Sequence, residues 1–427
     1  QVAPIRNEPG KGYYVSTFIL NERAVPHQLS FRTHHTLQRL AQYHFLQNNE
    51  KMANFEVMKI LFVGDASNMH HCLAQQLRKM GHHAIVASNG SGWMNTNRDI
   101  DLRRNPGKIG AVQYVAKLLT NLHKMRGFDI VELSNPIFLQ LKPWRIRPIF
   151  DYLKKHNGKI VLSALGTDYV YYHACFDGKT YRYSDYMIGN EPSPFYQSKE
   201  YVEYEEDNWK ADFMKRHSDY VLERINGVVA CLWEYYVAYA PIMGDKVIHA
   251  GLPIDVDNLT PHFIDEEPEK VRFFIGVQRD RNILKGTDRL LAALENVHRE
   301  MPDLCEIERV ENLPYDEYVR SMNRSHVLLD QLYSYTPATN ALLAMAQGLV
   351  AVSGAEPEYY DLIGETTNHP IINVRPTPEG DIEEKLRWIV SNKALLPKLS
   401  HDSRDFVVKH NAASIVANRY LNFWQSL

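Results

Sequence analysis

The chain has 427 residues, of which 44% are hydrophobic and 23% are charged. This composition is ordinary for a globular protein of two or three domains and excludes a disordered, collagen-like or low-complexity chain. A formal net charge of -3 argues against a chain that binds nucleic acid over its whole surface.

The cysteines and the apolar runs indicate a cytoplasmic location. The four cysteines (Cys72, Cys175, Cys231, Cys305) are far apart and form no CxxC pair, so we expect reduced thiols. No apolar run approaches the roughly 18–20 residues that span a bilayer, and the N-terminus lacks the order of a secretory signal. We interpret residues 1–57, which begin without Met, as an N-terminal extension and a candidate non-native segment.

The first part of the chain after this extension alternates short apolar runs with helical periodicity. Each apolar run of buried-strand type is followed by a helix, which is the pattern of βαβ units with parallel strands. A Tyr-rich insertion at 171–210 interrupts the alternation. We expect strands at 58–63, 84–87, 128–133, 159–163, 227–230 and 246–249, and helices at 71–80, 110–125 and 149–156. On the helix at 110–125, the apolar face predicted to be buried consists of Val112, Val115, Leu118, Leu119 and Leu122.

A second series of the same kind follows a linker near 261–270. Strands are expected at 271–276, 326–330 and 349–352, and helices at 287–300, 340–347, 380–392 and 403–426. Two βα series in tandem predict an α/β protein with two Rossmann-like domains that face each other across a cleft. We place the domains at 58–250 and 251–405, with a C-terminal helix at 406–427 that packs back toward the first domain.

The loop between the strand at 271–276 and the helix at 287–300 is rich in cations. In a doubly wound sheet, ligands bind beside such strand ends. Arg279, Arg281 and Lys285 can neutralise a diphosphate, and Gly286 allows a close backbone approach. The alternative is a basic loop that water solvates.

A second polar loop, at 330–340, leads into a helix of small residues. The free N–H groups and the positive dipole end at a helix start suit a phosphate. Tyr335, Thr336, Thr339 and Asn340 are therefore candidate ligand-binding residues. The alternative is a loop in which Thr339 or Asn340 caps the helix.

Together these segments resemble the C-terminal domain of retaining glycosyltransferases of family 4, which have the GT-B fold and are common in bacterial polysaccharide assembly. The cationic loop ending in Lys285-Gly286 looks like the diphosphate site of that family. Ala344-Met345-Ala346-Gln347-Gly348 looks like its EAMAxG helix, and residues 246–255 look like its crossing into the second domain. The resemblance covers roughly residues 58–427.

The resemblance implies a nucleoside-diphosphate sugar as the donor, bound mainly by the second domain, and a glycan or lipid-linked acceptor bound by the first. Arg281 and Lys285 would hold the diphosphate, with Arg279 as an alternative to Arg281. The family needs no resident cofactor and no divalent metal, and we expect none here. Asp65 and Asn68, in the loop after the first strand, are candidate acceptor contacts, although a tight βα turn explains them equally well.

The sequence departs from the family at three positions. The family carries two glutamates eight residues apart, and Tyr335 and Leu343 stand there instead. Glu356 or Glu358 is a candidate replacement acceptor, and the alternative is a capped turn before the helix at Tyr359. Leu165 replaces a histidine of the family motif, although the motif's aspartate remains as Asp168. Asp168 is a candidate catalytic contact to sugar hydroxyls and equally a candidate helix N-cap.

The segment 98–159 is strongly basic. It holds 13 Lys and Arg against five acids, a net charge of +8 in a chain of net charge -3. Interleaved aromatic and apolar residues suit an anionic membrane, so we predict peripheral contact at the inner face of the membrane. The alternative is a set of scattered, solvated cations.

The sequence is compatible with three functions. The first is a retaining, hexosyltransferase-like enzyme of cell-surface polysaccharide synthesis. The second is a catalytically silent GT-B protein that binds a glycan or a partner, because the two family glutamates are missing. The third, a nicotinamide-dependent oxidoreductase, is disfavoured because Gly64-Asp65-Ala66-Ser67-Asn68 does not form a GxGxxG fingerprint.

Overall fold

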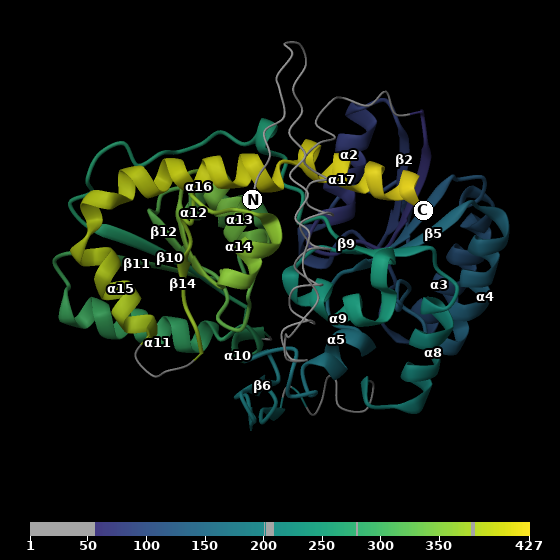
Figure 1. Cartoon of the computed structure of the whole chain (residues 1–427), viewed down its shortest axis with the longest axis horizontal. Helices are drawn as coiled ribbons and strands as arrows, with labels where there is room; N and C mark the ends of the chain where they lie inside the picture. Colours follow the sequence, from purple (N-terminus) through teal and green to yellow (C-terminus); the bar gives the residue numbers. More distant parts are fainter. Residues whose placement is uncertain (1–55, 200, 202–208, 279–280, 377–380) are drawn as a thin grey trace, which may run out of the picture. The chain divides into compact units, whose positions relative to one another are not determined.

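The computed structural model describes residues 56–199, 201, 209–278, 281–376 and 381–427 (Figure 1). The predicted extension at 1–57 lies outside the described residues except for its last two, and Arg279 lies outside them as well. The described residues belong to one compact unit.

The first half of this unit is built on a sheet of seven parallel strands in the order β3-β2-β1-β4-β5-β8-β9. Short runs of Val, Ile, Leu and Ala form these strands because helices cover both faces of a parallel sheet. The strands are β1 (Lys59–Val63), β2 (His83–Ser88), β3 (Ile100–Asp101), β4 (Ile130–Leu133), β5 (Lys159–Ala164), β8 (Gly227–Ala230) and β9 (Val247–His249). The helices are α2 (Met69–Lys79), α3 (Gly107–Asn121), α4 (Pro143–His156), α5 (Tyr169–Ala174), α8 (Asp212–Leu222) and α9 (Trp233–Met243).

The second half is built on five parallel strands in the order β11-β10-β12-β13-β14. These strands are β10 (Val271–Val277), β11 (Cys305–Glu311), β12 (Val327–Leu329), β13 (Val350–Ser353) and β14 (Ile372–Asn373). The helices are α10 (Asn282–Lys285), α11 (Thr287–Glu300), α12 (Tyr315–Met322), α13 (Thr339–Ala346), α14 (Pro357–Ile363), α15 (Asp381–Ser391), α16 (Leu396–Asn411) and α17 (Ala413–Ser426). The insertion holds a small antiparallel pair, β6 (Met187–Ile188) and β7 (Glu191–Pro192).

The two βα series confirm the predicted α/β fold with two Rossmann-like domains, but two details of the prediction are wrong. The buried stripe of α3 is Gly110, Tyr114 and Leu118, whereas Val112 and Leu119 are exposed. Of the face predicted to be buried, Leu118 is therefore confirmed, Val115 and Leu122 are half-buried, and Val112 and Leu119 point into solvent.

The single helix predicted at 403–426 is two helices. α16 ends at Asn411, and the extended residue Ala412 separates it from α17. At this break the chain forms a β-bridge with Ile254, whose N–H donates to the Asn411 carbonyl (2.8 Å) and whose carbonyl accepts from the Ala413 N–H (2.9 Å). The break lies where the segment that connects the two sheets meets the C-terminal helices.

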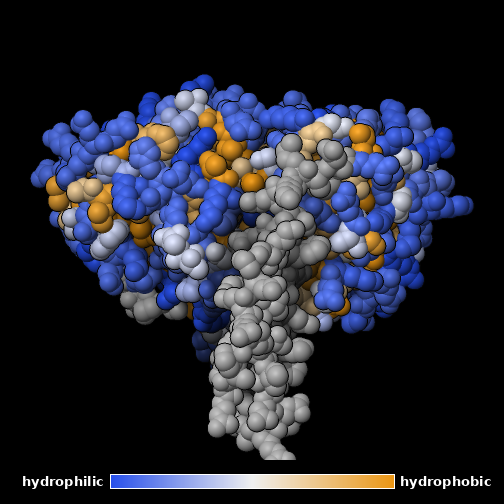
Figure 2. Space-filling model, turned by 45° about the horizontal axis from the view of Figure 1, so that its top comes forward, coloured by the Kyte–Doolittle hydropathy of each residue, from blue (hydrophilic) through white to orange (hydrophobic). Residues whose placement is uncertain are grey.

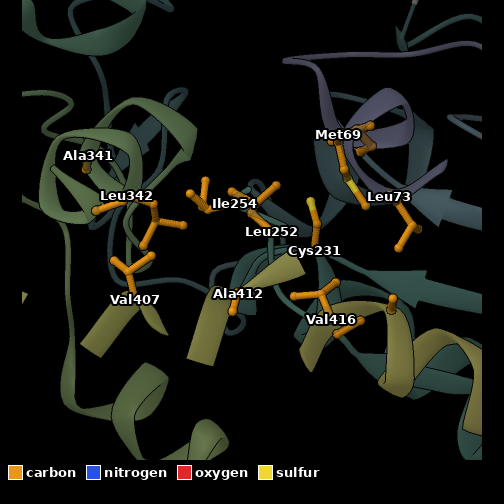
Figure 3. Close-up of a cluster of buried hydrophobic side chains, with 14 of the residues drawn as sticks. Met69, Leu73, Cys231, Leu252, Ile254, Ala341, Leu342, Val407, Ala412 and Val416 are labelled. Carbon is orange, nitrogen blue, oxygen red and sulfur yellow. The ribbon is translucent and has the colours of Figure 1, made fainter. Parts of the chain in front are cut away.

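This connecting segment is anchored by apolar side chains from both halves. Figure 3 shows Leu252 and Ile254 between Leu342 of α13 on one side and Met69 and Leu73 of α2 on the other. All five side chains are buried in one cluster. The two halves therefore share a continuous core at this point.

The apolar surface and the length of the helices bear on contact with a membrane. On the face shown in Figure 2, hydrophilic residues cover most of the surface and apolar residues gather in small separate patches. Within the described part of the chain, every helix is too short or too polar to cross a bilayer. The four cysteines are all buried and unpaired as disulfides.

A buried network of hydrogen bonds connects α17 to the first sheet. Trp424 Nε1 donates to Glu132 Oε2 (3.0 Å), and Ser163 Oγ donates to Glu132 Oε1 (2.7 Å). His70 Nε2 lies 2.9 Å from the same Ser163 hydroxyl. Burial raises the pKa of Glu132 to about 8, so its carboxyl is protonated in the folded chain at neutral pH.

This carboxyl gives a testable pH dependence. Between pH 4.5 and 8 the unfolded chain has lost the Glu132 proton and the folded chain has kept it. The free energy of unfolding therefore falls with rising pH by about 1.4 kcal/mol per pH unit from this group. Denaturant titrations should show that wild type loses stability relative to Glu132→Gln across this window. Glu223 is exposed, so the stability of Glu223→Gln should change with pH as that of wild type does. If the stability of Glu132→Gln also changes with pH as wild type does, the raised pKa of Glu132 is contradicted.

Candidate active site

The predicted cationic loop and the predicted polar loop lie against each other. α10 carries Lys285, whose carbonyl accepts a hydrogen bond from the Leu332 N–H (2.9 Å). Gly286 adopts φ +67°, and a Cβ there would approach Leu332 Cβ to 2.7 Å and Tyr333 to 2.9 Å. The missing side chain of Gly286 therefore admits the neighbouring loop, where the sequence had suggested a close approach to a ligand.

Lys285 lies in a partly desolvated, charged environment at the carboxyl end of β12. Its side chain is half-buried, and Arg281 beside it is exposed. Burial lowers the pKa of Lys285, while the charge of Asp330 opposes this shift. Asp330 is buried; its Oδ1 accepts from Asn340 Nδ2 (3.3 Å), and its Oδ2 has no hydrogen-bond partner among the described residues. A cation, a carboxylate and an amide thus lie close together beyond the end of β12.

The backbone of the polar loop is held by a carboxylate from the first half of the chain. Glu234, in the first turn of α9, accepts from the N–H groups of Tyr335 (2.5 Å) and Thr336 (3.1 Å) through Oε1. Its Oε2 accepts from Thr336 Oγ1 (2.8 Å), which in turn accepts from the Trp233 N–H (3.1 Å). Glu234 is buried, and burial raises its pKa. Glu234 therefore occupies the backbone N–H groups of Tyr335 and Thr336, two residues that the sequence predicted to bind a ligand.

Tyr335, at the position of the first family glutamate, is enclosed by aromatic rings. Its ring stacks between those of Trp233 (centroids 4.7 Å apart) and Tyr183 (4.6 Å). Its hydroxyl accepts from the N–H groups of Arg182 (2.6 Å) and Tyr183 (3.2 Å). The side chain is 1% exposed, so in this conformation Tyr335 offers no surface to a ligand.

The start of α13 does not follow the capping alternative. The N-cap residue is Ala338, and no side chain caps the helix. Thr339 is the first helical residue, and Asn340 Oδ1 accepts from the Tyr318 hydroxyl (3.0 Å). The interpretation in which Thr339 or Asn340 caps this helix is therefore wrong. The first N–H groups of an α-helix have no acceptor within the helix and can bind a phosphate, so phosphate binding at α13 stays a prediction.

Glu356 is a buried carboxylate that is paired with two partly exposed arginines. Arg375 donates to both of its oxygens (2.7 and 3.0 Å), and Tyr183 Oη (2.9 Å) and Asn373 Nδ2 (2.9 Å) donate to Oε1. Arg182 reaches Oε2 (2.7 Å). Burial works to raise the pKa of Glu356, but these donors outweigh it and the pKa is lowered.

Glu358, the other candidate acceptor, lies beside Glu356 at the start of α14. It is partly exposed and pairs with Arg182 through both carboxylate oxygens. Both candidates thus lie next to Tyr335, as the sequence predicted for replacements of the family glutamates, and both are paired with cations of the chain. Their role in binding a donor stays a prediction.

Asp168 is the N-cap of α5. Its Oδ1 accepts from the Tyr171 N–H (2.8 Å) and its Oδ2 accepts from Tyr239 Oη (2.6 Å). The side chain is buried, and burial raises its pKa to about 6. Of the two alternatives for Asp168, the structure shows the helix cap.

The two acceptor candidates lie in the turn between β1 and α2. Asp65 accepts from the His70 N–H (2.9 Å) and from Thr96 Oγ1 (3.2 Å), and burial raises its pKa to about 6. Asn68 has φ +63°, and its buried Oδ1 finds no hydrogen-bond partner in the part of the chain that the structure describes. Hydrogen bonds within the chain thus account for the position of Asp65 in the turn, while acceptor binding stays a prediction.

Several site residues carried no signal in the sequence. Glu234, Arg182, Tyr183 and Arg375 belong to none of the motifs, although two of them lie in the Tyr-rich insertion that interrupts the βα pattern. The interruption of the βα pattern is the one feature of the sequence that indicates a special role for the residues of this insertion. Among the described residues, no cluster of three or more His, Cys, Asp and Glu side chains is arranged to hold a metal ion.

Comparison with known proteins supports the fold. No protein-family model matches the chain, and no curated protein sequence matches it. Among solved structures, it is similar to sucrose-phosphate synthase from Thermosynechococcus elongatus, with TM-score 0.55 and 11% identity over 86% of this chain and 98% of that one. It is also similar to Anabaena HepE in complex with UDP-glucose, with TM-score 0.53 and 13% identity over 87% of this chain and 100% of that one.

A third similar structure is the catalytic domain of starch synthase IV from Arabidopsis thaliana bound to ADP and acarbose. The TM-score is 0.53 and the identity 9%, over 87% of this chain and 99% of that one. Identities this low show the fold alone. The chain therefore has the GT-B fold of these glycosyltransferases, with two Rossmann-like domains.

Removal of the Thr336 hydroxyl tests the contact between α9 and the polar loop. Thr336→Val keeps the shape but leaves the Trp233 N–H without an acceptor and takes one donor from the buried Glu234 carboxylate. We expect a loss of about 1–3 kcal/mol in the free energy of unfolding, measured by denaturant titration. Thr120→Val, at an exposed hydroxyl that bonds only its own helix, is the control and should stay within about 0.5 kcal/mol. Equal effects of the two variants would contradict the contact.

Proposed function

We propose that the chain is a glycosyltransferase that moves a sugar from a nucleoside-diphosphate sugar to a glycan or lipid-linked acceptor with retention, in cell-surface polysaccharide synthesis. The observation that carries this proposal is the direct contact between α10, with its cation Lys285, and the loop that enters α13. A GT-B fold supports it, as do the UDP-glucose and ADP held by two structures of that fold. Retention and the polysaccharide role rest on the resemblance to family 4.

The chemistry proposed for this site is electrostatic. As the bond to the sugar breaks, negative charge develops on the departing diphosphate, and the cations of Lys285 and Arg281 stabilise it. The half-buried Lys285 is the stronger contributor because charges interact more strongly where water is excluded. The N–H groups at the start of α13 add further donors to the diphosphate. The sugar carbon passes through an oxocarbenium-like state.

The second candidate is a catalytically silent GT-B protein that binds a glycan or a partner. The observation that favours it is that Tyr335, Thr336 and Glu356 are all bonded within the chain. Incubation with UDP-glucose or ADP-glucose separates the two candidates. Slow release of free UDP or ADP, by hydrolysis or transfer, shows an active enzyme and excludes the silent one.

We also propose that the first half of the chain contacts an anionic membrane through α3. Ile109, Val112 and Leu119 lie on one face of this helix and are 77%, 71% and 57% exposed. Trp144 is also exposed, and it lines a groove of about 600 Å³ together with residues of α3 and the cations Arg104, Lys142 and Arg145. Exposed apolar residues beside cations match an anionic lipid surface.

Lys285→Ala tests donor binding. At a nucleotide concentration of 100 Kd, binding stabilises the folded state by about 2.7 kcal/mol, which raises the melting temperature by a few degrees. We expect UDP or ADP to produce this shift in wild type and in Lys398→Ala, whose lysine is an exposed cation of α16 paired with Asp402. The shift should vanish in Lys285→Ala. A wild type whose melting temperature ignores every nucleoside diphosphate would refute the proposal.

Membrane contact is tested by co-sedimentation with lipid vesicles. Each apolar side chain of α3 that enters the lipid contributes about 1.5–3 kcal/mol, so Ile109→Asp with Val112→Asp should weaken binding to anionic vesicles at least tenfold. Ile242→Asp, at an exposed residue of α9, is the control. Equal binding to neutral and anionic vesicles, or no binding by wild type, would contradict the contact.

A further inference from the structure

The Tyr-rich insertion packs onto the elements of the candidate donor site. Its aromatic core, which includes Tyr186 and Phe195, contacts Ile283 and Leu284 of α10, the helix that carries Lys285. Ile188 of β6 packs against the core of the second half. In Figure 1, β6 accordingly lies beside α10. The insertion leaves from the first sheet and reaches the donor side of the second.

Within the insertion, the segment Tyr181–Tyr183 (the lid segment) covers Tyr335. Two of its backbone N–H groups donate to the Tyr335 hydroxyl, and the Tyr183 ring stacks on the Tyr335 ring. The Arg182 guanidinium lies 5.2 Å from the centroid of the same ring. The lid segment therefore closes the loop that leads to α13 on the side where Glu356 and Glu358 also lie.

Arg182 can leave its ion pairs without exposing an unpaired charge in the interior. Arg182 bonds Glu356 and Glu358, yet its side chain is 54% exposed, so water can solvate the guanidinium when it leaves. Glu356 stays paired with Arg375 through two hydrogen bonds, so no buried carboxylate loses its only cation. Removal of one partner of a buried ion pair is costly when the other charge stays buried without a partner, and departure of Arg182 leaves no such charge. Departure of Arg182 also frees Glu358 to accept from a donor hydroxyl.

We propose that the lid segment closes the donor site of the ligand-free chain, with Arg182 as its latch, and that a nucleoside-diphosphate sugar binds only after the lid segment moves away. This inference rests on the proposed function, because it assumes the donor site at α10 and the loop before α13. The measured affinity for a donor is then the intrinsic affinity reduced by the fraction of molecules that are open. Loss of the latch increases this fraction and so tightens binding.

The test uses the full chain, with UDP and ADP as probes in calorimetric titrations. Arg182→Gln should bind the nucleotide three- to tenfold more tightly than wild type, which corresponds to about 0.7–1.4 kcal/mol. Tyr183→Phe keeps the ring but loses the hydroxyl bond to Glu356, and it should show a smaller gain. Arg387→Gln removes a guanidinium with similar double pairing, to Glu300 and Glu383, and as the control it should not change the affinity.

Hydrogen exchange of the lid segment gives a second readout that needs no activity. Exchange at 181–183 should rise in Arg182→Gln without nucleotide, and it should rise in wild type when UDP or ADP binds. Equal or weaker nucleotide binding by Arg182→Gln, or slower exchange in wild type on binding, would overturn the lid while leaving the donor site intact. If neither wild type nor Arg182→Gln binds UDP or ADP, the donor site and the lid are both refuted.

Discussion

The carboxylate of Glu234 is the interaction on which the geometry of the candidate site depends. A buried carboxylate must be satisfied by donors, and Glu234 finds three of them on Tyr335 and Thr336. The polar loop before α13 is thereby fixed to the start of α9. Since α9 follows a strand of the first sheet, the first half of the chain sets the position of a loop in the second. Any ligand of this loop meets groups from both halves.

The aromatic contacts of Tyr335 also connect this loop to the first half of the chain. A carboxylate at this position would need water or cations around it, whereas a tyrosine ring can be buried between Trp233 and Tyr183. The hydroxyl is satisfied by backbone N–H groups of the insertion. Tyr335 is therefore held by contacts to the Tyr-rich insertion. The carboxylates that remain nearby, Glu356 and Glu358, are balanced by Arg375 and Arg182.

The sequence predicted much of the fold because burial on both faces of a parallel sheet leaves a strong local pattern. The strands at 58–63, 159–163 and 271–276 and the helix at 287–300 lie within a residue or two of β1, β5, β10 and α11. The contact between the Lys285 loop and the loop at 330–340 follows from the same rule, since carboxyl ends of parallel strands meet at one edge. On α3 the prediction holds for Leu118 and fails for Val112 and Leu119, because periodicity alone does not say which apolar residues face the sheet.

The long-range contacts of Tyr335 could not be predicted from the sequence. Glu234 lies 101 residues before Tyr335, and Arg182 lies 153 residues before it. No local pattern records such pairs. The role of Asp168 as a helix cap or a sugar contact was also undecided, because a capping aspartate and a catalytic one have the same place after a strand. The partners of Asp168 are Tyr171 and Tyr239, and only the tertiary structure brings Tyr239 to it.

The central claim is that a nucleoside diphosphate binds where α10 meets the loop before α13. A crystal structure of the chain with UDP or ADP tests it most directly. The claim predicts the diphosphate within hydrogen-bond distance of Lys285 Nζ and of the first N–H groups of α13. A diphosphate bound elsewhere, with Lys285 turned toward solvent, would contradict it.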